Sequence, residues 1–344
     1  MKILKILGIF LGVLVILGVI LFNTKIGQHF YNAYKFSSSL SGTVLDEEIT
    51  KDDNQKAADL KTGAIYSQKH FELKDMPAFW DNFSENGEFK EKYKYLEQVD
   101  FSIITYKSDS QLIHGIVAAP KKEGKYPVVL FNKGGNKEVG KIAAGKTLYT
   151  MLSLVSKLAS EGYVIIGSCY RENDEFGGRD INDVLALTET AKEMDNVDAS
   201  RIGMLGWSRG GMMTYLALKN SDAIKTAVVG NGPTNLLTLA KERPEMEKNV
   251  YSQLIPNYDT QKEEQLTKRS AIFWPEQLSK NSSLLILSGS QDENVNPQQA
   301  KDIAEKLTAL DYNFKHLEFD TDHGFKGKQD ELYQTLTDWF GEKL

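Results

Sequence analysis

The sequence predicts an α/β fold built on a mostly parallel β-sheet that helices cover on both faces. Beyond Val99, segments with strand character alternate with segments of helical periodicity, which is typical of parallel sheets with crossover helices. Pro127–Phe131 is a short, continuous apolar run, as expected of a strand buried on both faces. Val99–Tyr106 and Gln111–Ala118 are predicted to form a hairpin, which would make one edge of the sheet antiparallel.

The remaining elements follow in order along the chain. A helix contains Leu148 to Leu158 at helical spacing and is predicted to end at Gly162, and Asp180 is placed to cap a helix at Ile181–Met194. The other predicted strands are Tyr163–Ile166, Arg201–Leu205, Ile224–Val229, Leu284–Leu287 and Asn313–Phe319. The other predicted helices are Met212–Leu218, Gln298–Leu310 and Gln329–Phe340. The interval 231–282 interrupts the alternation and is expected to be a helical cap at the carboxyl edge of the sheet, where ligands bind in such folds.

The first 24 residues differ in composition from the rest. Lys2 and Lys5 precede Ile6–Phe22, which has no charged or strongly polar side chain and would span about 25 Å as a helix, near the lower limit for a hydrocarbon core. Because no small-residue cleavage site follows, we expect residues 1–24 to be an uncleaved membrane anchor, with a removed signal peptide as the alternative. The two lysines favour a single-pass protein of the cell membrane whose body lies outside the cytoplasm.

Residues 25–98 are expected to form a stalk and an N-terminal segment that packs on the main domain, residues 99–344. The polar stretch 36–61 is predicted to be a solvated stalk or a loosely packed helix that carries no site. Residues 62–98 carry scattered aromatic side chains among charges, which indicates that they fold against the domain.

Composition excludes several classes of function. The 344 residues are 41% hydrophobic and 10% aromatic, which is enough for a packed core and excludes wholesale disorder. A net charge of −6 argues against nucleic-acid binding, because phosphates require a basic face. The single cysteine, Cys169, excludes an intrachain disulfide and cysteine-rich metal sites.

Residues 201–211 contain the most informative motif. A predicted strand runs directly into Gly206-x-Ser208-x-Gly210, the pattern of a serine on a tight turn between a strand and a helix. Such a serine needs a strained backbone to lift its hydroxyl clear of the sheet, and a Cβ two residues to either side would collide with neighbouring elements. The pattern predicts that Ser208 is a nucleophile; the alternative is a glycine-rich turn with an inert serine.

A serine hydroxyl needs a base within hydrogen-bond reach and an acid that orients the base. In a sheet of this kind, the acid and then the histidine follow the serine along the chain. Only His316 and His323 follow Ser208, and His316 falls inside a predicted strand. We therefore predict that His323, in the loop 320–325, is the base; the alternative is a loop histidine held by a neighbouring aspartate.

The acid is expected on the loop that follows the preceding strand. Asp292 lies a few residues after Leu284–Leu287 and is the predicted acid, with the adjacent Glu293 as the alternative. The negative charge that develops on the attacked carbonyl oxygen needs preorganised donors. We expect them from the backbone N–H of Arg209, at the start of a helix, and from the loop Lys133, Gly134 and Gly135. The Arg209 side chain is expected only to lie along the surface.

Other candidate residues are weaker. Trp207 and Trp274 are candidates for lining a substrate pocket, with core packing as the alternative. Asp320 and Asp322 with His323 could bind a metal in principle, but this interpretation is disfavoured, and no metal or cofactor is predicted. The loop 176–180 lacks the spacing of a phosphate cradle.

With these residues in place, the chain resembles the prolyl oligopeptidase group of serine peptidases, within the α/β-hydrolase superfamily. The stretches that carry the resemblance, in the family's order, are Gly177-Gly178 to Asp183, Val197-Asp198-x-x-Arg201-Ile202-Gly203, Gly206 to Gly211, Arg269-Ser270-Ala271, Leu284–Leu287 with Asp292-x-x-Val295, and His323-Gly324-Phe325. The resemblance spans residues 100–344. It implies a Ser208–Asp292–His323 triad that acts through an acyl-enzyme on a short peptide or a small ester.

Two departures from the family pattern keep ester cleavage open beside peptide cleavage. Many members carry a β-propeller ahead of the catalytic domain, which residues 25–98 are too few to form. Many also place a tyrosine or histidine where this chain has Lys133. The alternatives to hydrolysis are acyl transfer from the same acyl-enzyme and a non-catalytic binding protein on this fold. Substrate specificity is expected to come from residues 231–282 and 62–98.

Overall fold

The computed structural model describes residues 25–344, so the anchor predicted at residues 6–22 lies outside the described part of the chain. Within residues 25–344, no helix combines the length and the apolar character needed to cross a bilayer.

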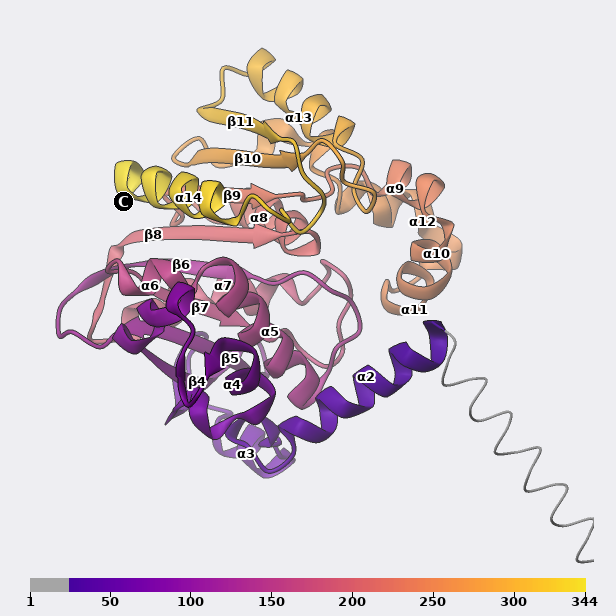
Figure 1. The fold of residues 1–344 in the computed structure, drawn as a ribbon. Coiled ribbons are helices and arrows are strands. Elements are labelled where there is room, and N and C mark those ends of the chain that lie inside the picture. Colours follow the sequence, from indigo (N-terminus) through magenta and orange to yellow (C-terminus); the bar gives the residue numbers. More distant parts are fainter. Residues whose placement is uncertain (1–24) are drawn as a thin grey trace, which may run out of the picture.

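A nine-stranded sheet forms the centre of the molecule (Figure 1). In spatial order the strands are β1 (Ile65–Phe71), β4 (Val99–Ser108), β5 (Gln111–Pro120), β7 (Val164–Ser168), β6 (Tyr126–Asn132), β8 (Val197–Trp207), β9 (Thr226–Gly230), β10 (Ser283–Gly289) and β11 (Phe314–Phe319). The six strands from β7 to β11 in this order run parallel, which confirms the predicted sheet. A separate two-stranded ribbon pairs β2 (Ser84–Glu85) with β3 (Glu88–Phe89).

The predicted hairpin is confirmed, but it does not form the edge of the sheet. Strands β4 and β5 pair antiparallel around a turn in which Asp109 has a φ of +50°. Strand β1 pairs antiparallel with β4 and takes the edge position. Strand β1 was not predicted, because its segment mixes polar and aromatic residues without a clean alternation.

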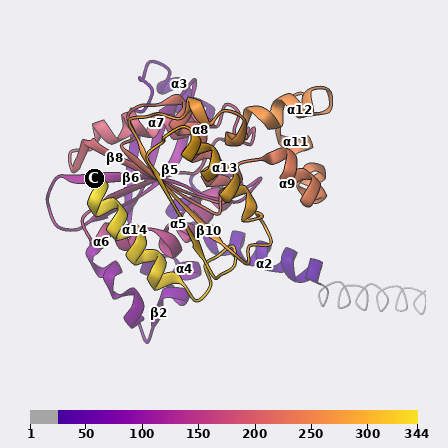
Figure 2. The same ribbon diagram turned by 90° about the horizontal axis from the view of Figure 1, so that it is seen from above.

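Helices cover both faces of the sheet (Figures 1 and 2). The helices are α2 (Lys25–Leu40), α3 (Lys51–Lys56), α4 (Pro77–Phe83), α5 (Gly140–Leu154), α6 (Ser156–Ser160), α7 (Ile181–Thr190), α8 (Arg209–Asn220), α9 (Leu236–Glu242), α10 (Pro244–Met246), α11 (Ser252–Leu254), α12 (Tyr258–Lys268), α13 (Gln298–Ala309) and α14 (Gln329–Lys343). Buried residues of α7, α8 and α13 belong to one hydrophobic cluster, and those of α5, α6 and α14 belong to the other.

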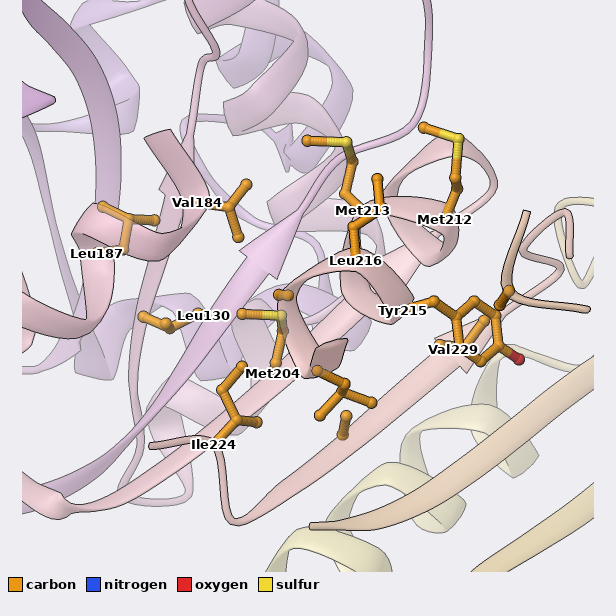
Figure 3. Close-up of a cluster of buried hydrophobic side chains, with 14 of the residues drawn as sticks. Leu130, Val184, Leu187, Met204, Met212, Met213, Tyr215, Leu216, Ile224 and Val229 are labelled. Atoms are coloured by element: carbon orange, nitrogen blue, oxygen red, sulfur yellow. The ribbon is translucent and has the colours of Figure 1, made fainter. Parts of the chain in front are cut away.

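Strand β6 shows how the sheet separates these two clusters. Its side chains alternate between the faces, with Val128 and Leu130 in the first cluster and Val129 and Phe131 in the second, all fully buried. This explains the continuous apolar run in the sequence, because both faces of the strand are covered. Figure 3 shows part of the first cluster, in which Leu130 of β6 and Met204 of β8 lie opposite side chains of α7 and α8.

The segment 231–282 folds into α9 to α12 and short turns, and Figure 1 shows these helices beyond the carboxyl ends of the parallel strands. The description of residues 36–61 as a solvated stalk is wrong for the part around Leu40 and Leu45, which are fully buried. Leu40 ends α2, which packs against α5, so the chain is already part of the folded body at this point.

Candidate active site

The predicted nucleophile lies on a strained turn between β8 and α8. Ser208 has φ +56° and ψ −125°, a combination that a residue with a side chain adopts only under constraint. Its backbone N–H donates to the carbonyl of Gly230 on β9 over 2.9 Å, which holds the turn against the sheet. Ser208 is partly exposed, whereas Trp207 and Arg209 on either side of it are buried.

The two flanking glycines are required by close approach of the backbone. A Cβ on Gly206 would lie 2.0 Å from the carbonyl oxygen of Gly210, and a Cβ on Gly210 would lie 1.8 Å from that of Asn132. Side-chain rotation cannot relieve either contact, because both neighbours are backbone atoms. The sequence-based explanation of the glycine spacing is therefore confirmed.

His323 and Asp292 come together at the carboxyl edge of the sheet. His323 follows β11, Asp292 follows β10, and the imidazole Nδ1 lies 2.7 Å from Asp292 Oδ2. The Asp292 side chain is fully buried, and its other oxygen accepts hydrogen bonds from the backbone N–H groups of Asn294 and Val295 over 2.7 and 3.0 Å. The alternative acid, Glu293, is exposed. The carboxylate is thus fixed and the imidazole is oriented by it.

Ser208 and His323 line the same pocket. Within residues 25–344, the imidazole of His323 forms its hydrogen bond with Asp292, and no hydrogen bond joins Ser208 Oγ to the ring. In unliganded sites the bond between nucleophile and base is often long and tightens when substrate binds. The structure therefore brings Ser208 and His323 to one cavity, with His323 already hydrogen-bonded to Asp292.

Asn231 joins three loops of the site and was missed in the sequence analysis. Its amide nitrogen donates to the carbonyl of His323 over 3.0 Å, and its amide oxygen accepts from the backbone N–H of Gly289 over 2.9 Å. The indole N–H of Trp207 donates to the same His323 carbonyl over 3.0 Å. Asn231 comes directly after β9, and its position at a strand end next to the serine strand was the available signal.

Replacing Asn231 with alanine is expected to lower the free energy of unfolding by about 1–3 kcal/mol, because buried hydrogen-bonding groups of Gly289 and His323 lose a partner. Turnover should fall as well, since the backbone carbonyl of His323 loses the hydrogen bond from the Asn231 amide. Urea denaturation and steady-state kinetics measure both effects. The exposed Gln291→Ala in the neighbouring loop is the control, with a change within about 0.5 kcal/mol. Equal stability of the two variants would contradict the bridging role.

The loop after β6, which was predicted to supply oxyanion donors, lies close to Ser208. A Cβ on Gly134 would lie 3.2 Å from Ser208 Cβ and 3.1 Å from the carbonyl oxygen of Trp207, and Gly135 has a φ of +91°. Both glycines line the pocket with Ser208. The side chain of Lys133 points elsewhere: it is buried, with its ammonium 3.4 Å from Glu138. Burial lowers the pKa of Lys133, and the charge of Glu138 partly opposes this.

Arg209 is the first residue of α8, so its backbone N–H has no acceptor within the helix. Its side chain does not lie along the surface, as the sequence analysis expected. The guanidinium is buried and forms a bidentate ion pair with Asp174 over 2.5 and 2.6 Å and a further bond to Asp180 over 2.8 Å. It also lies over the rings of Tyr170 and Phe176, at 4.9 and 4.8 Å from their centroids.

The buried acids of this cluster have roles that their sequence context did not reveal. Asp180 occupies the N-cap position of α7, but its carboxylate accepts from the backbone N–H groups of Gly177 and Gly178 and from Arg209 instead of capping the helix. Burial opposes ionisation of Asp174, but the charge of Arg209 and its hydrogen bonds outweigh this and lower the pKa of Asp174.

The two tryptophans and the aspartates of the histidine loop, which were the remaining candidate residues, have different positions in the structure. Trp207 lines the pocket with Ser208, whereas Trp274 is buried in the helical segment 231–282 and donates to the carbonyl of Thr267 over 3.1 Å, so its assignment to the pocket is wrong. Asp322 accepts from the backbone N–H groups of Gly324 and Lys326 and holds the histidine loop. Among residues 25–344, no group of three or more potential metal ligands is present.

Taken together, these residues can perform nucleophilic substitution at a carbonyl. The site offers a hydroxyl on a constrained turn, an imidazole held by a buried carboxylate, and backbone N–H groups next to the serine. Those are the components that acyl transfer to a serine requires.

Comparison with known proteins agrees with this arrangement. The sequence model of the prolyl oligopeptidase family matches residues 165–344, slightly more than half of the chain. The chain is similar to a Bacillus subtilis protein named uncharacterized peptidase YtmA, with 26% identity over 253 residues, covering 71% of this chain and 94% of that protein. It is also similar to dipeptidyl peptidase 8 of Mus musculus, with 30% identity over 186 residues, covering 50% of this chain and 20% of that protein.

Solved structures show the same fold. The acylaminoacyl peptidase of Pyrococcus horikoshii superposes with a TM-score of 0.61 at 22% identity, covering 76% of this chain and 45% of the other. Dipeptidyl peptidase 4 of Porphyromonas gingivalis superposes with a TM-score of 0.59 at 20% identity, covering 71% and 36%. The chain thus spans nearly all of YtmA but less than half of the dipeptidyl and acylaminoacyl peptidases.

Proposed function

The chain belongs to the prolyl oligopeptidase family of serine peptidases, and we propose that it cleaves an acyl bond of a short peptide or an ester through a triad of Ser208, His323 and Asp292. The observation that carries this proposal is the 2.7 Å contact between His323 and Asp292 at the pocket into which Ser208 projects from its strained turn.

In the first half of the reaction, Ser208 Oγ attacks the substrate carbonyl carbon while His323 Nε2 takes the hydroxyl proton. Asp292 accepts the hydrogen bond from Nδ1–H and stabilises the imidazolium that forms. The backbone N–H of Arg209 and the Gly134–Gly135 loop stabilise the oxyanion. The tetrahedral intermediate collapses, His323 returns the proton to the leaving amine or alcohol, and the acyl group remains on Ser208.

In the second half, water replaces the leaving group. His323 takes a proton from the water as its oxygen attacks the acyl-enzyme carbonyl, and the second tetrahedral intermediate breaks the bond to Ser208 Oγ. The proton returns to Oγ and a free carboxylic acid leaves. No metal or cofactor takes part in either half.

The proposal is tested by covalent labelling. A fluorophosphonate probe should modify the folded enzyme once, on the peptide that contains Ser208, and should not modify heat-unfolded protein. Loss of turnover should follow the labelled fraction. Release of nitroaniline from aminoacyl p-nitroanilides would identify peptide-bond cleavage, and p-nitrophenyl esters report ester cleavage. An adduct on another residue, or equal labelling of unfolded protein, would contradict the nucleophile.

We further propose that residues 6–22 anchor the enzyme in the cell membrane with the catalytic domain outside the cytoplasm. The support is the uncharged apolar run behind Lys2 and Lys5. The full chain should remain with membranes after a carbonate wash, and protease added to intact cells should degrade the catalytic domain. Recovery of the full-length chain in the carbonate supernatant would contradict the anchor.

A further inference from the structure

The pocket beside Ser208 is lined by two groups of residues, which we call its catalytic end and its apolar end. Its volume is about 460 Å³. Ser208, His323, Gly134 and Gly135 form the catalytic end. The side chains that form much of the rest are Phe36, Tyr149, Leu154 and Trp207.

The charge of the pocket points to a neutral occupant. Apart from the titratable His323, the charged residue among the described lining residues is Lys146. Its ammonium is paired with the carboxylate of Glu138 at 2.7 Å. None of the described residues that line the pocket carries a carboxylate, so these residues offer no counter-ion for a substrate amine. A volume in the lower part of the range for ligand pockets suits one bulky apolar group next to the reacting carbonyl.

Phe36 reaches this pocket from the far end of the sequence. It lies on α2, four residues before the fully buried Leu40. The helix fits closely against α5 at Gly145, where a Cβ would lie 2.6 Å from a Leu40 methyl and 3.1 Å from the Phe36 ring. Phe36 also meets Phe79 edge to face, with ring centroids 6.3 Å apart. The Phe36 ring is therefore a fixed wall of the pocket.

The residues that follow α2 form polar contacts with α5. Lys141 on α5 donates to Ser41 over 2.9 Å and pairs with Asp46 at 2.8 Å. These contacts hold the carboxyl end of α2 in place. The residues that form most of the apolar end, Phe36, Tyr149 and Leu154, all lie before residue 165, where the match to the family model begins.

We propose that the apolar end of this pocket binds an aromatic or branched aliphatic group of the substrate, and that Phe36 sets the largest group that fits. The inference rests on the proposed function, because it places the scissile carbonyl between Ser208 and the Gly134–Gly135 loop. Burial of the group against Phe36, Leu154 and Trp207 supplies the binding energy. Phe36 is thus a specificity-determining residue for the reaction.

The test measures kcat/KM for two series of esters. One series keeps the p-nitrophenyl leaving group and enlarges the acyl group from acetyl to phenylacetyl; the other keeps the acetyl group and enlarges the alcohol from methyl to naphthyl. The series that responds shows whether the acyl group or the leaving group occupies the pocket.

Substitutions at Phe36 should change size selectivity. Phe36→Trp is expected to lower kcat/KM for the bulkiest substrate of one series by about 10-fold or more and to leave the smallest substrate of each series within about 3-fold. Phe36→Ala should move the optimum of that series to larger groups. Tyr34→Ala, on the same helix but with Tyr34 72% exposed, is the matched control and should leave both series unchanged.

Gly145→Ala provides a second route to the same outcome if a Phe36 variant folds poorly. The added methyl presses on Leu40 and Phe36 without altering a lining side chain, so it should change the size optimum as well. Size selectivity that is the same in wild type, both Phe36 variants and Gly145→Ala would overturn the inference. Labelling of Ser208 separates the two proposals: labelled protein with unaltered selectivity defeats only the pocket assignment, whereas failed labelling defeats the function itself.

Discussion

Ser208→Ala is expected to lower kcat for p-nitrophenyl ester hydrolysis by about 10⁶-fold, because the attacking atom is removed and His323 has no proton to accept. The residual rate should exceed that in water, since the oxyanion donors remain. The measurement is a progress curve at high enzyme concentration, together with loss of the fluorophosphonate adduct. Retention of more than about one per cent of the activity would contradict the assignment.

The stability of the same variant provides its control. Alanine has the same difficulty as serine at φ +56°, so Ser208→Ala should change the free energy of unfolding by less than about 0.5 kcal/mol. Ser208→Gly removes the side chain that opposes this conformation and should raise the free energy of unfolding by about 1 kcal/mol while also abolishing activity. Chemical denaturation of both variants distinguishes a missing nucleophile from a damaged fold. A destabilised glycine variant would contradict the assignment of strain to this turn.

Arg209→Met is expected to lower the free energy of unfolding by about 3–5 kcal/mol, because the carboxylates of Asp174 and Asp180 lose their buried cation. The start of α8, directly after Ser208, should also move when these ion pairs are lost, so turnover should fall too. The matched control is Arg179→Ala nearby, whose ion pair with Glu175 is formed by a side chain that is 68% exposed. It should cost less than about 1 kcal/mol. Similar losses in both variants would show that the Arg209 pairs contribute no more than a surface pair.

The effect of Arg209→Met should depend on pH in a defined direction. The pKa of Asp174 is lower in the folded protein than the usual value, so the ionised pair stabilises the fold at pH values above that usual value, about 4. This stabilisation is lost as the pH falls through the lowered pKa. The stability difference between wild type and Arg209→Met should therefore be constant near neutral pH and narrow in strongly acidic solution. Denaturation at a series of pH values measures it.

Features encoded by local sequence could be predicted. The parallel strands were found from short apolar runs, since burial on both faces leaves no room for polar residues. Gly206 and Gly210 were predictable because their backbone contacts exclude a Cβ. The pairing of His323 with Asp292 followed from chain order and the requirement that catalytic groups lie at the carboxyl ends of strands.

Features that depend on distant contacts could not be predicted. Strand β1 is defined by its pairing with β4 and not by its own pattern. A surface position was expected for the Arg209 side chain because nothing local places Asp174 beside it. The positions of Trp274 and Phe36 could not be predicted for the same reason. Trp274 fills the interior of the helical segment 231–282, and Phe36, for which no role was predicted, lines the pocket from α2.

Because Phe36 lies on α2, the residue proposed to set substrate size is far in sequence from the residues proposed to carry out the reaction. The proposed triad residues Ser208, Asp292 and His323 all follow residue 200, whereas Phe36, which lines the same pocket, lies on α2 and packs against α5 at Gly145. Substitutions on α2 would then alter which substrates are accepted while the reaction itself stays intact.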